Sequence, residues 1–142
     1  MGFGTFPLFE KPPVATIRRF EDIEAWQKAR QLTKAVYGLT TSGAISRDFS
    51  LTNQIRRAAL SIMANIAEGF ERDGNKEFLQ FLAVAKGSCG ELRSHLCAGL
   101  DQRYITQKQH DLACEKAVEV SRMLSGLTRH LRETEMRGRK YR

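Results

Sequence analysis

The sequence predicts an all-α protein, an antiparallel up-and-down bundle of four helices. Four segments place apolar residues at alternating steps of three and four, short polar connections separate them, and no segment alternates like a β-strand. The 142 residues suffice for one domain with its own core. We divide the chain into an extended N-terminal arm over residues 1–19, the bundle over residues 20–133 and a basic C-terminal tail over residues 134–142.

The first two helices follow from their apolar stripes. We expect them over about residues 22–41 and 50–68, separated by a segment rich in Ser, Thr and Gly that breaks the pattern. All three prolines precede residue 20, which predicts the extended arm. The stripe residues are Ala25, Ala29, Leu32, Val36 and Leu39 in the first helix, and Leu51, Ile55, Ala58, Ala59, Ile62 and Ile66 in the second.

The third and fourth helices are marked by turn and cap signals. Gly69 and the residues after it predict a turn, with Asn75 as the N-cap of a third helix that reaches about Arg103. Thr106 and Gln109 match a capping box that opens the fourth helix. The stripe residues are Phe78, Leu82, Ala85, Cys89, Leu92 and Leu96, then Ala113, Ala117, Val120, Leu124, Leu127 and Leu131.

The amino-acid composition indicates the cellular environment and the kind of partner that we expect for the protein. Lys and Arg total 23 against 16 Asp and Glu, a formal charge of +7, which favours polyanionic partners. The three cysteines, Cys89, Cys97 and Cys114, are odd in number and lack Cys-x-x-Cys spacing, so we expect no disulfide framework and a reducing cytoplasm. We expect no signal peptide and no membrane span, because no run approaches the ~20 apolar residues that a span needs.

The second predicted helix is apolar beyond its core stripe. Helical steps of about 100° place Leu60, Met63, Ala64 and Ala67 on its side or back, where a lone bundle would leave them in water. We therefore predict a homo-oligomer whose interface includes these four residues. Two alternatives remain: the helix tolerates small apolar residues outside, or the phenylalanines of the N-terminal arm fold over it.

Several glycines lie inside predicted helices. Gly87 and Gly90 in the third helix and Gly126 in the fourth each cost about 1 kcal/mol relative to alanine. Close approach of a neighbouring helix is the usual compensation, and we expect it here. A ligand-binding notch is the alternative.

The chain carries no recognisable catalytic apparatus. A di-iron bundle needs Glu-x-x-His pairs, whereas Glu91 and His95 are four residues apart. His110 and Cys114 share one helical face, but two ligands do not make a zinc site. No glycine-rich phosphate loop and no G-x-S-x-G elbow occurs. We expect a non-enzymatic protein without catalytic residues, metal or cofactor.

Three residues form a structural motif at the end of the second helix: Asn65, Glu68 and Gly69. Asn65 lies near the edge of the core stripe, where an amide needs hydrogen-bond partners, so we interpret it as a register-fixing amide. Glu68 ends the helix where the dipole disfavours an anion. We expect Arg72 or the amides at the start of the third helix to bind it, in preference to a role as catalytic carboxylate.

The basic residues give the candidate nucleic-acid contacts. Arg56 and Arg57 lie on a helix whose only acidic residue is Glu68, and Lys86 and Arg93 are seven apart on one face. A solvated surface is the alternative for each of them. The candidate set is Arg56, Arg57, Arg72, Lys76, Lys86 and Arg93 in the bundle, with Arg137, Arg139 and Lys140 in the tail.

One stretch around the second helix has a distinctive order of residues: Gln54, Ile55, Arg56, Arg57, Ala58, Ser61, Ile62, Asn65, Ile66, Ala67, Glu68 and Gly69. This stretch resembles the signature of the four-helix bundle proteins related to 23S rRNA intervening-sequence proteins. The resemblance covers about residues 20–131, while the arm and the tail have no match in the family pattern. The fold is also similar to the accessory variability determinant of diversity-generating retroelements.

The resemblance implies a homopentamer around a central channel and no established enzymatic activity. Together with the net charge it leads to our function hypothesis, a non-catalytic homo-oligomeric bundle that binds RNA or DNA through basic surfaces. The alternative is a protein-assembly adaptor that docks an enzyme such as a reverse transcriptase.

Overall fold

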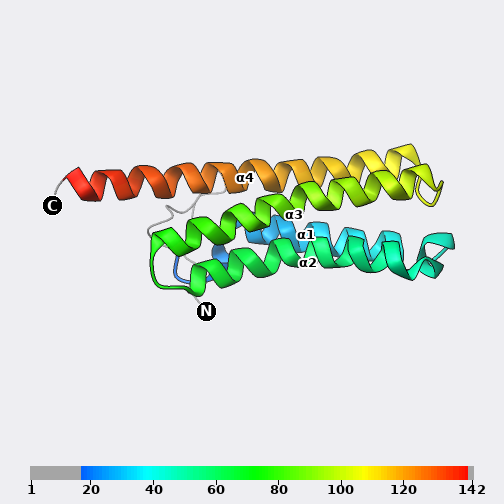
Figure 1. The fold of residues 1–142 in the computed structure, drawn as a ribbon, viewed down its shortest axis with the longest axis horizontal. Helices are drawn as coiled ribbons and strands as arrows, with labels where there is room; N and C mark the ends of the chain where they lie inside the picture. The colour runs from blue at the N-terminus through cyan, green and yellow to red at the C-terminus, as the bar shows by residue number, and fades with distance from the viewer. Residues whose placement is uncertain (1–16, 141–142) are drawn as a thin grey trace.

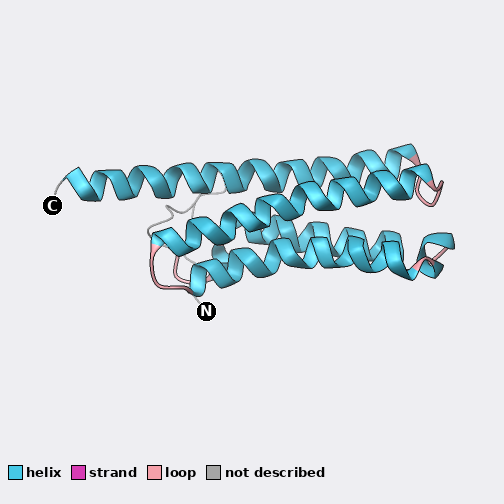
Figure 2. Ribbon diagram, in the orientation of Figure 1, coloured by secondary structure: helices cyan, strands magenta, loops and turns pink. Residues whose placement is uncertain are grey.

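The computed structural model describes the backbone of residues 17–140 and the side chains of residues 17–136. Four long helices lie along a common direction and alternate up and down, with no strand in the described chain (Figures 1 and 2). The predicted all-α four-helix bundle is confirmed. The elements are η2 (Phe20–Asp22), α1 (Glu24–Thr40), η3 (Ala44–Arg47), α2 (Phe49–Glu71), α3 (Asn75–Asp101) and α4 (Gln107–Lys140).

Helices that follow each other in sequence pack side by side, and α1 closes the bundle against α4. This arrangement leaves α1 diagonal to α3. Helix α4 is the longest and runs on to Lys140, through residues that we had assigned to the tail over 134–142. Its last turns extend past the end of the bundle at which α2 turns into α3 (Figure 1).

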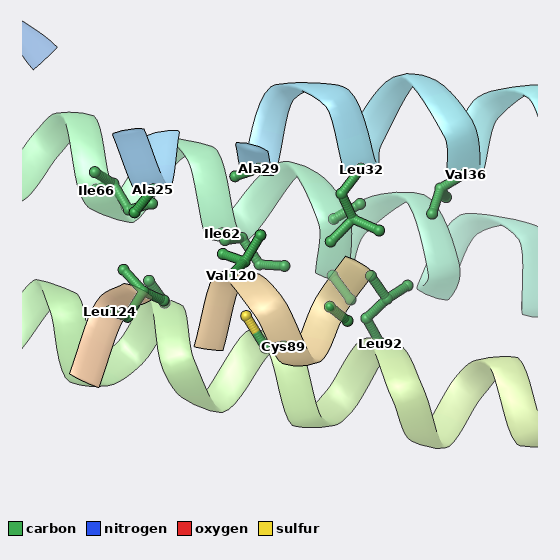
Figure 3. Packing of buried hydrophobic residues seen from close by; sticks show 14 of the residues in the cluster. Ala25, Ala29, Leu32, Val36, Ile62, Ile66, Cys89, Leu92, Val120 and Leu124 are labelled. Atoms are coloured by element: carbon green, nitrogen blue, oxygen red, sulfur yellow. The ribbon is translucent and has the colours of Figure 1, made fainter. Parts of the chain in front are cut away.

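Most residues of the predicted stripes are buried in the core, but Leu39 and Leu51 are only half-buried at its edge. Three residues outside the stripes, Ile23, Ile45 and Ile105, are also buried there. Leu32, Ile62, Leu92 and Leu124 come from the four helices in turn and are all 0% exposed. Figure 3 shows stripe residues from the four helices gathered between the ribbons. Burying one such side chain contributes roughly 1.5–3 kcal/mol, which makes these stripes the main source of stability.

Two helix starts are capped by side chains. The predicted capping box is confirmed: the Thr106 amide donates to Gln109 Oε1 at 2.8 Å, and the Gln109 amide donates to Thr106 Oγ1 at 3.1 Å. Asp48 caps α2 by accepting from the Leu51 amide at 3.1 Å. The Tyr104 hydroxyl also donates to Asp48 at 3.1 Å, which joins the α3–α4 turn to the start of α2.

The predictions for the α2–α3 turn are wrong at two residues. Asn75 is not an N-cap: α3 begins at it, and the cap position is Gly74, at φ +115°, which L side chains rarely adopt. Gly69 is not in a turn, because α2 continues through it to Glu71. Gly69 is buried, and a Cβ there would lie 2.6 Å from Phe81 Cβ. Its lack of a side chain lets α2 and α3 approach each other.

The predicted close contacts at Gly87, Gly90 and Gly126 are absent. A Cβ at any of these three glycines would meet nothing within 4 Å. Within the described chain, the glycine that a close approach requires is Gly69.

Replacing Gly69 by alanine is therefore expected to destabilise the fold by about 1–3 kcal/mol, since the new methyl group overpacks the α2–α3 contact. Gly126→Ala is the matched control: it enters open space in a helix and should stabilise by about 0.5–1 kcal/mol. Urea unfolding of both variants measures the difference. Equal or greater stability of Gly69→Ala would show that the close approach is not required.

Candidate nucleic-acid interface

Two contacts fix how α3 and α4 lie against each other. Lys86 Nζ donates to Ser125 Oγ at 2.6 Å, and Cys97 Sγ lies 3.5 Å from His110 Nε2. Residues toward the end of α3 therefore face residues toward the start of α4. Arg93 lies seven residues after Lys86 and four before Cys97, so all three lie on the α4 side of α3.

Beyond Lys86 the surface opens into a groove of about 460 Å³. Its lining includes four apolar side chains, three cations and one anion, Glu133. We call the surface formed by Lys86 and Arg93 of α3 with Arg129 and Arg132 of α4 the α3/α4 seam. The groove is lined by Leu79, Leu82, Ala83, Lys86, Ser125, Thr128, Arg129, Arg132, Glu133 and Met136.

The seam carries a net positive charge, and Glu133 is the one carboxylate that lines its groove. None of its four cations forms an ion pair with another described residue, and the partner of Lys86 is a neutral hydroxyl. Residues 78–90 of α3 and 120–132 of α4 contain no Asp or Glu. The seam therefore presents unpaired positive charge along two adjacent helices.

Two of the residues predicted to contact nucleic acid interact instead with other side chains of the bundle. Arg56 Nε donates to Thr40 Oγ1 at 2.9 Å, and its guanidinium carbon lies 4.5 Å from the centroid of the Tyr37 ring. This half-buried arginine joins α2 to α1 by a hydrogen bond and a cation–π contact.

Arg72 is held in the same way. It pairs with Glu68 at 3.0 Å, and its guanidinium carbon lies 5.4 Å from the centroid of the Phe81 ring. This contact confirms Arg72 as the partner expected for Glu68.

The remaining predicted cations are spread over the surface. Arg57 and Lys76 are exposed, on α2 and in the first turn of α3, and neither belongs to the seam. Arg137, Arg139 and Lys140 have side chains outside the described residues. Of the predicted set, the seam brings together Lys86 and Arg93.

Sequence reasoning missed Arg129 and Arg132. A signal was present, because Ser125, Arg129 and Arg132 follow steps of four and three beside the core stripe of α4. To predict that they lie beside Lys86, one must know the register of α3 against α4, which the sequence does not specify.

The polar residues at the α2–α3 contact form a short chain of hydrogen bonds. Asn65 Nδ2 donates to the Ser61 carbonyl at 2.8 Å and to Ser61 Oγ at 3.0 Å. Ser61 Oγ in turn lies 2.8 Å from Ser88 Oγ on α3. These two bonds of the Asn65 amide remain within α2, and Ser61 makes the hydrogen bond that crosses to α3.

The four residues of the predicted oligomer interface differ in their exposure in the single chain. Leu60 is 44% exposed and Ala64 is also exposed, whereas Met63 and Ala67 are half-buried. No charged residue occurs between Arg57 and Glu68. We call the surface of Leu60, Met63, Ala64 and Ala67 the α2 outer face.

None of the helices within residues 17–140 contains an apolar stretch sufficient to span a bilayer. No group of three or more His, Cys, Asp and Glu side chains in this part of the chain is arranged to hold a metal ion.

Comparison with known proteins shows which fold and which family the chain matches. It is similar in fold to the crystal structure of a protein of unknown function from the S23 ribosomal protein family of Bacteroides thetaiotaomicron, with a TM-score of 0.69 and 22% sequence identity. The match covers 74% of this chain and 95% of that one. Comparison with curated proteins gave no match. The profile of the 23S rRNA-intervening sequence proteins matches residues 21–126, well over half of the sequence, so the chain belongs to the 23S rRNA-intervening sequence protein family.

Proposed function

We propose that this protein binds the phosphate backbone of RNA or DNA on the α3/α4 seam, without strong sequence preference. The observation that carries the proposal is the set of four cations, two from each helix, that have no carboxylate partner among the described residues. Cations of this kind bind phosphates and release the counterions condensed on the nucleic acid.

The spread of the charge favours a polymer over a small anion. Lys86 and Arg93 are seven residues apart, about 10 Å along the helix axis, which exceeds the size of one phosphate group. None of the residues that line the groove is aromatic, so it offers no platform for base stacking. Contacts limited to phosphates position a nucleic acid but carry no base information.

Fluorescence anisotropy with a labelled single-stranded RNA tests this function. We expect binding in the micromolar range, about 10⁻⁴–10⁻⁶ M, and similar affinity for an RNA of shuffled sequence. Polyglutamate of similar length serves as the control polyanion, and weaker binding of it separates recognition of phosphates from a general attraction to negative charge. Absence of RNA binding at low salt would exclude the proposed function.

We also propose that the chain self-associates through the α2 outer face, as the family resemblance implies for a ring of five subunits. The exposed Leu60 and Ala64 lie in the charge-free stretch of α2, and burial of such a face is the usual way to remove apolar surface from water. Assembly would repeat the seam once per subunit and raise its avidity for a polyanion.

A protein-assembly adaptor is the second candidate function. Arg57 is exposed on α2, three residues before Leu60 and away from the seam, which suits a partner protein such as a reverse transcriptase. Loss of such a complex on Arg57→Glu, with RNA binding retained, would favour this function.

A further inference from the structure

Two thiols meet one imidazole where α3 and α4 face each other near their connecting turn. His110 Nε2 lies 3.5 Å from Cys97 Sγ on α3 and 3.4 Å from Cys114 Sγ on α4. Both distances end on the same nitrogen, so the two sulfur atoms lie no further apart than the sum of these distances. The pairing of Cys97 with this site depends on the packing of α3 against α4.

The imidazole is held in the tautomer that accepts a proton from a thiol. His110 Nδ1 lies 3.0 Å from Asp111 Oδ1, which also accepts from Gln107 Nε2 at 2.8 Å. The bond from His110 lowers the pKa of Asp111, so its carboxylate is ionised at neutral pH and accepts hydrogen bonds only. Nδ1 therefore carries the hydrogen, and Nε2 is the basic nitrogen that faces the two sulfurs.

The three cysteines differ in access. Cys97 is exposed, Cys114 is half-buried, and Cys89 is fully buried in the core. Burial raises the pKa of Cys89 to about 11 and also raises the pKa of Cys114. A water-borne oxidant therefore reaches Cys97 first, while Cys89 remains an inert core thiol.

We propose that Cys97 and Cys114 form a redox pair that hydrogen peroxide converts to a disulfide, with His110 as the base. His110 Nε2 takes the proton of the Cys97 thiol, and the thiolate attacks one peroxide oxygen. The O–O bond breaks, and the leaving hydroxide takes the proton back from His110, which leaves Cys97 sulfenic acid and one water. The Cys114 sulfur then attacks the sulfenic sulfur, the S–O bond breaks, and a second water leaves with the Cys114 proton. The two sulfurs lose two electrons in total, and the peroxide gains them.

The disulfide would tie α3 to α4 beside the α3/α4 seam, since Arg93 lies one turn before Cys97. Reduction by a thiol would restore the pair.

Trypsin places the three cysteines in three different peptides, so mass spectrometry can identify which two cysteines form the disulfide. Cleavage after Arg and Lys leaves Cys89, Cys97 and Cys114 in the peptides 87–93, 94–103 and 109–116. We would treat the full-length protein with hydrogen peroxide in the presence of a metal chelator, alkylate the remaining thiols, digest and record mass spectra. We expect peptide 94–103 linked to peptide 109–116, lost on reduction, with peptide 87–93 alkylated. Sulfinic or sulfonic acid at Cys97 without that link, or a link between two copies of Cys97, would overturn the proposal.

Variants separate the steps. Cys114→Ser should leave a sulfenic acid on Cys97 that dimedone traps. His110→Asn should slow disulfide formation by about tenfold or more, because the base is removed. His95→Asn is the matched control: His95 also faces a carboxylate, Glu91 at 3.3 Å, but has no hydrogen bond to a thiol among the described residues. The rate of this variant should equal that of the parent. Circular dichroism checks that each variant folds, and equal rates for His110→Asn and His95→Asn would remove His110 from the mechanism.

Discussion

Replacing Lys86, Arg129 and Arg132 together by glutamate is expected to weaken RNA binding on the order of 100-fold at low salt. The three residues line one groove, and the described residues offer them no carboxylate partner, so their charge is available to phosphates. Reversal removes three attractions and adds three repulsions at the same site. Fluorescence anisotropy with the same labelled RNA measures the loss, and circular dichroism checks the fold.

The control for this variant changes the net charge equally at another place. Arg30, Lys34 and Arg47 are exposed cations on α1 and η3, and α1 lies diagonal to α3. Their replacement by glutamate should reduce affinity far less than the groove variant does. If both triple variants lose affinity equally, net charge governs binding and the seam has no special part in it.

Leu60→Asp is expected to convert the assembly to single chains of 16.1 kDa. An aspartate at the centre of the α2 outer face would have to leave water on assembly without a partner, a cost of several kcal/mol per subunit. Multi-angle light scattering at micromolar concentration measures the mass. The parent protein should give about five times the mass of one chain if the ring implied by the resemblance forms.

Leu112→Asp is the control for the assembly. Leu112 is 50% exposed on α4, close to the 44% of Leu60, and lies outside the α2 outer face. It should leave the mass unchanged. A parent protein that runs as single chains, or equal dissociation by both variants, would contradict the proposed interface.

The fold was predictable because apolar spacing determines which side of each helix is buried. The stripe of α4 is an example: Ala113, Leu124 and Leu131 were expected in the core, and all three are buried. The capping box at Thr106 was equally readable, because both of its hydrogen bonds are local in sequence.

The errors lie where tertiary packing decides the local structure. Gly69 was predicted to lie in a turn, yet α2 continues through it. A glycine is required there because Phe81 of α3 leaves no room for a Cβ. We expected a neighbouring helix to lie close to Gly87, Gly90 and Gly126, yet these glycines face open space in the single chain. Composition alone does not distinguish a glycine required by a neighbour from one that is tolerated.

The candidate site was only partly predictable for the same reason. From the sequence, Arg56 was expected to be a free cation, but in the structure it contacts Tyr37 and Thr40 of α1. Arg129 and Arg132 join Lys86 only once α3 and α4 are in register. The meeting of Cys97 with His110 likewise depends on that register, whereas the contact of His110 with Cys114, four residues apart on one helix, was readable.

The salt dependence of RNA binding is the most direct test of phosphate binding on the α3/α4 seam. If four seam cations each contact one phosphate, log affinity should fall against log salt with a slope of about −3, so binding weakens roughly 50-fold between about 50 and about 200 mM salt. The groove variant should show a slope nearer zero over the same range. Affinity that does not change with salt, or an unchanged slope after reversal of Lys86, Arg129 and Arg132, would contradict phosphate binding on the α3/α4 seam.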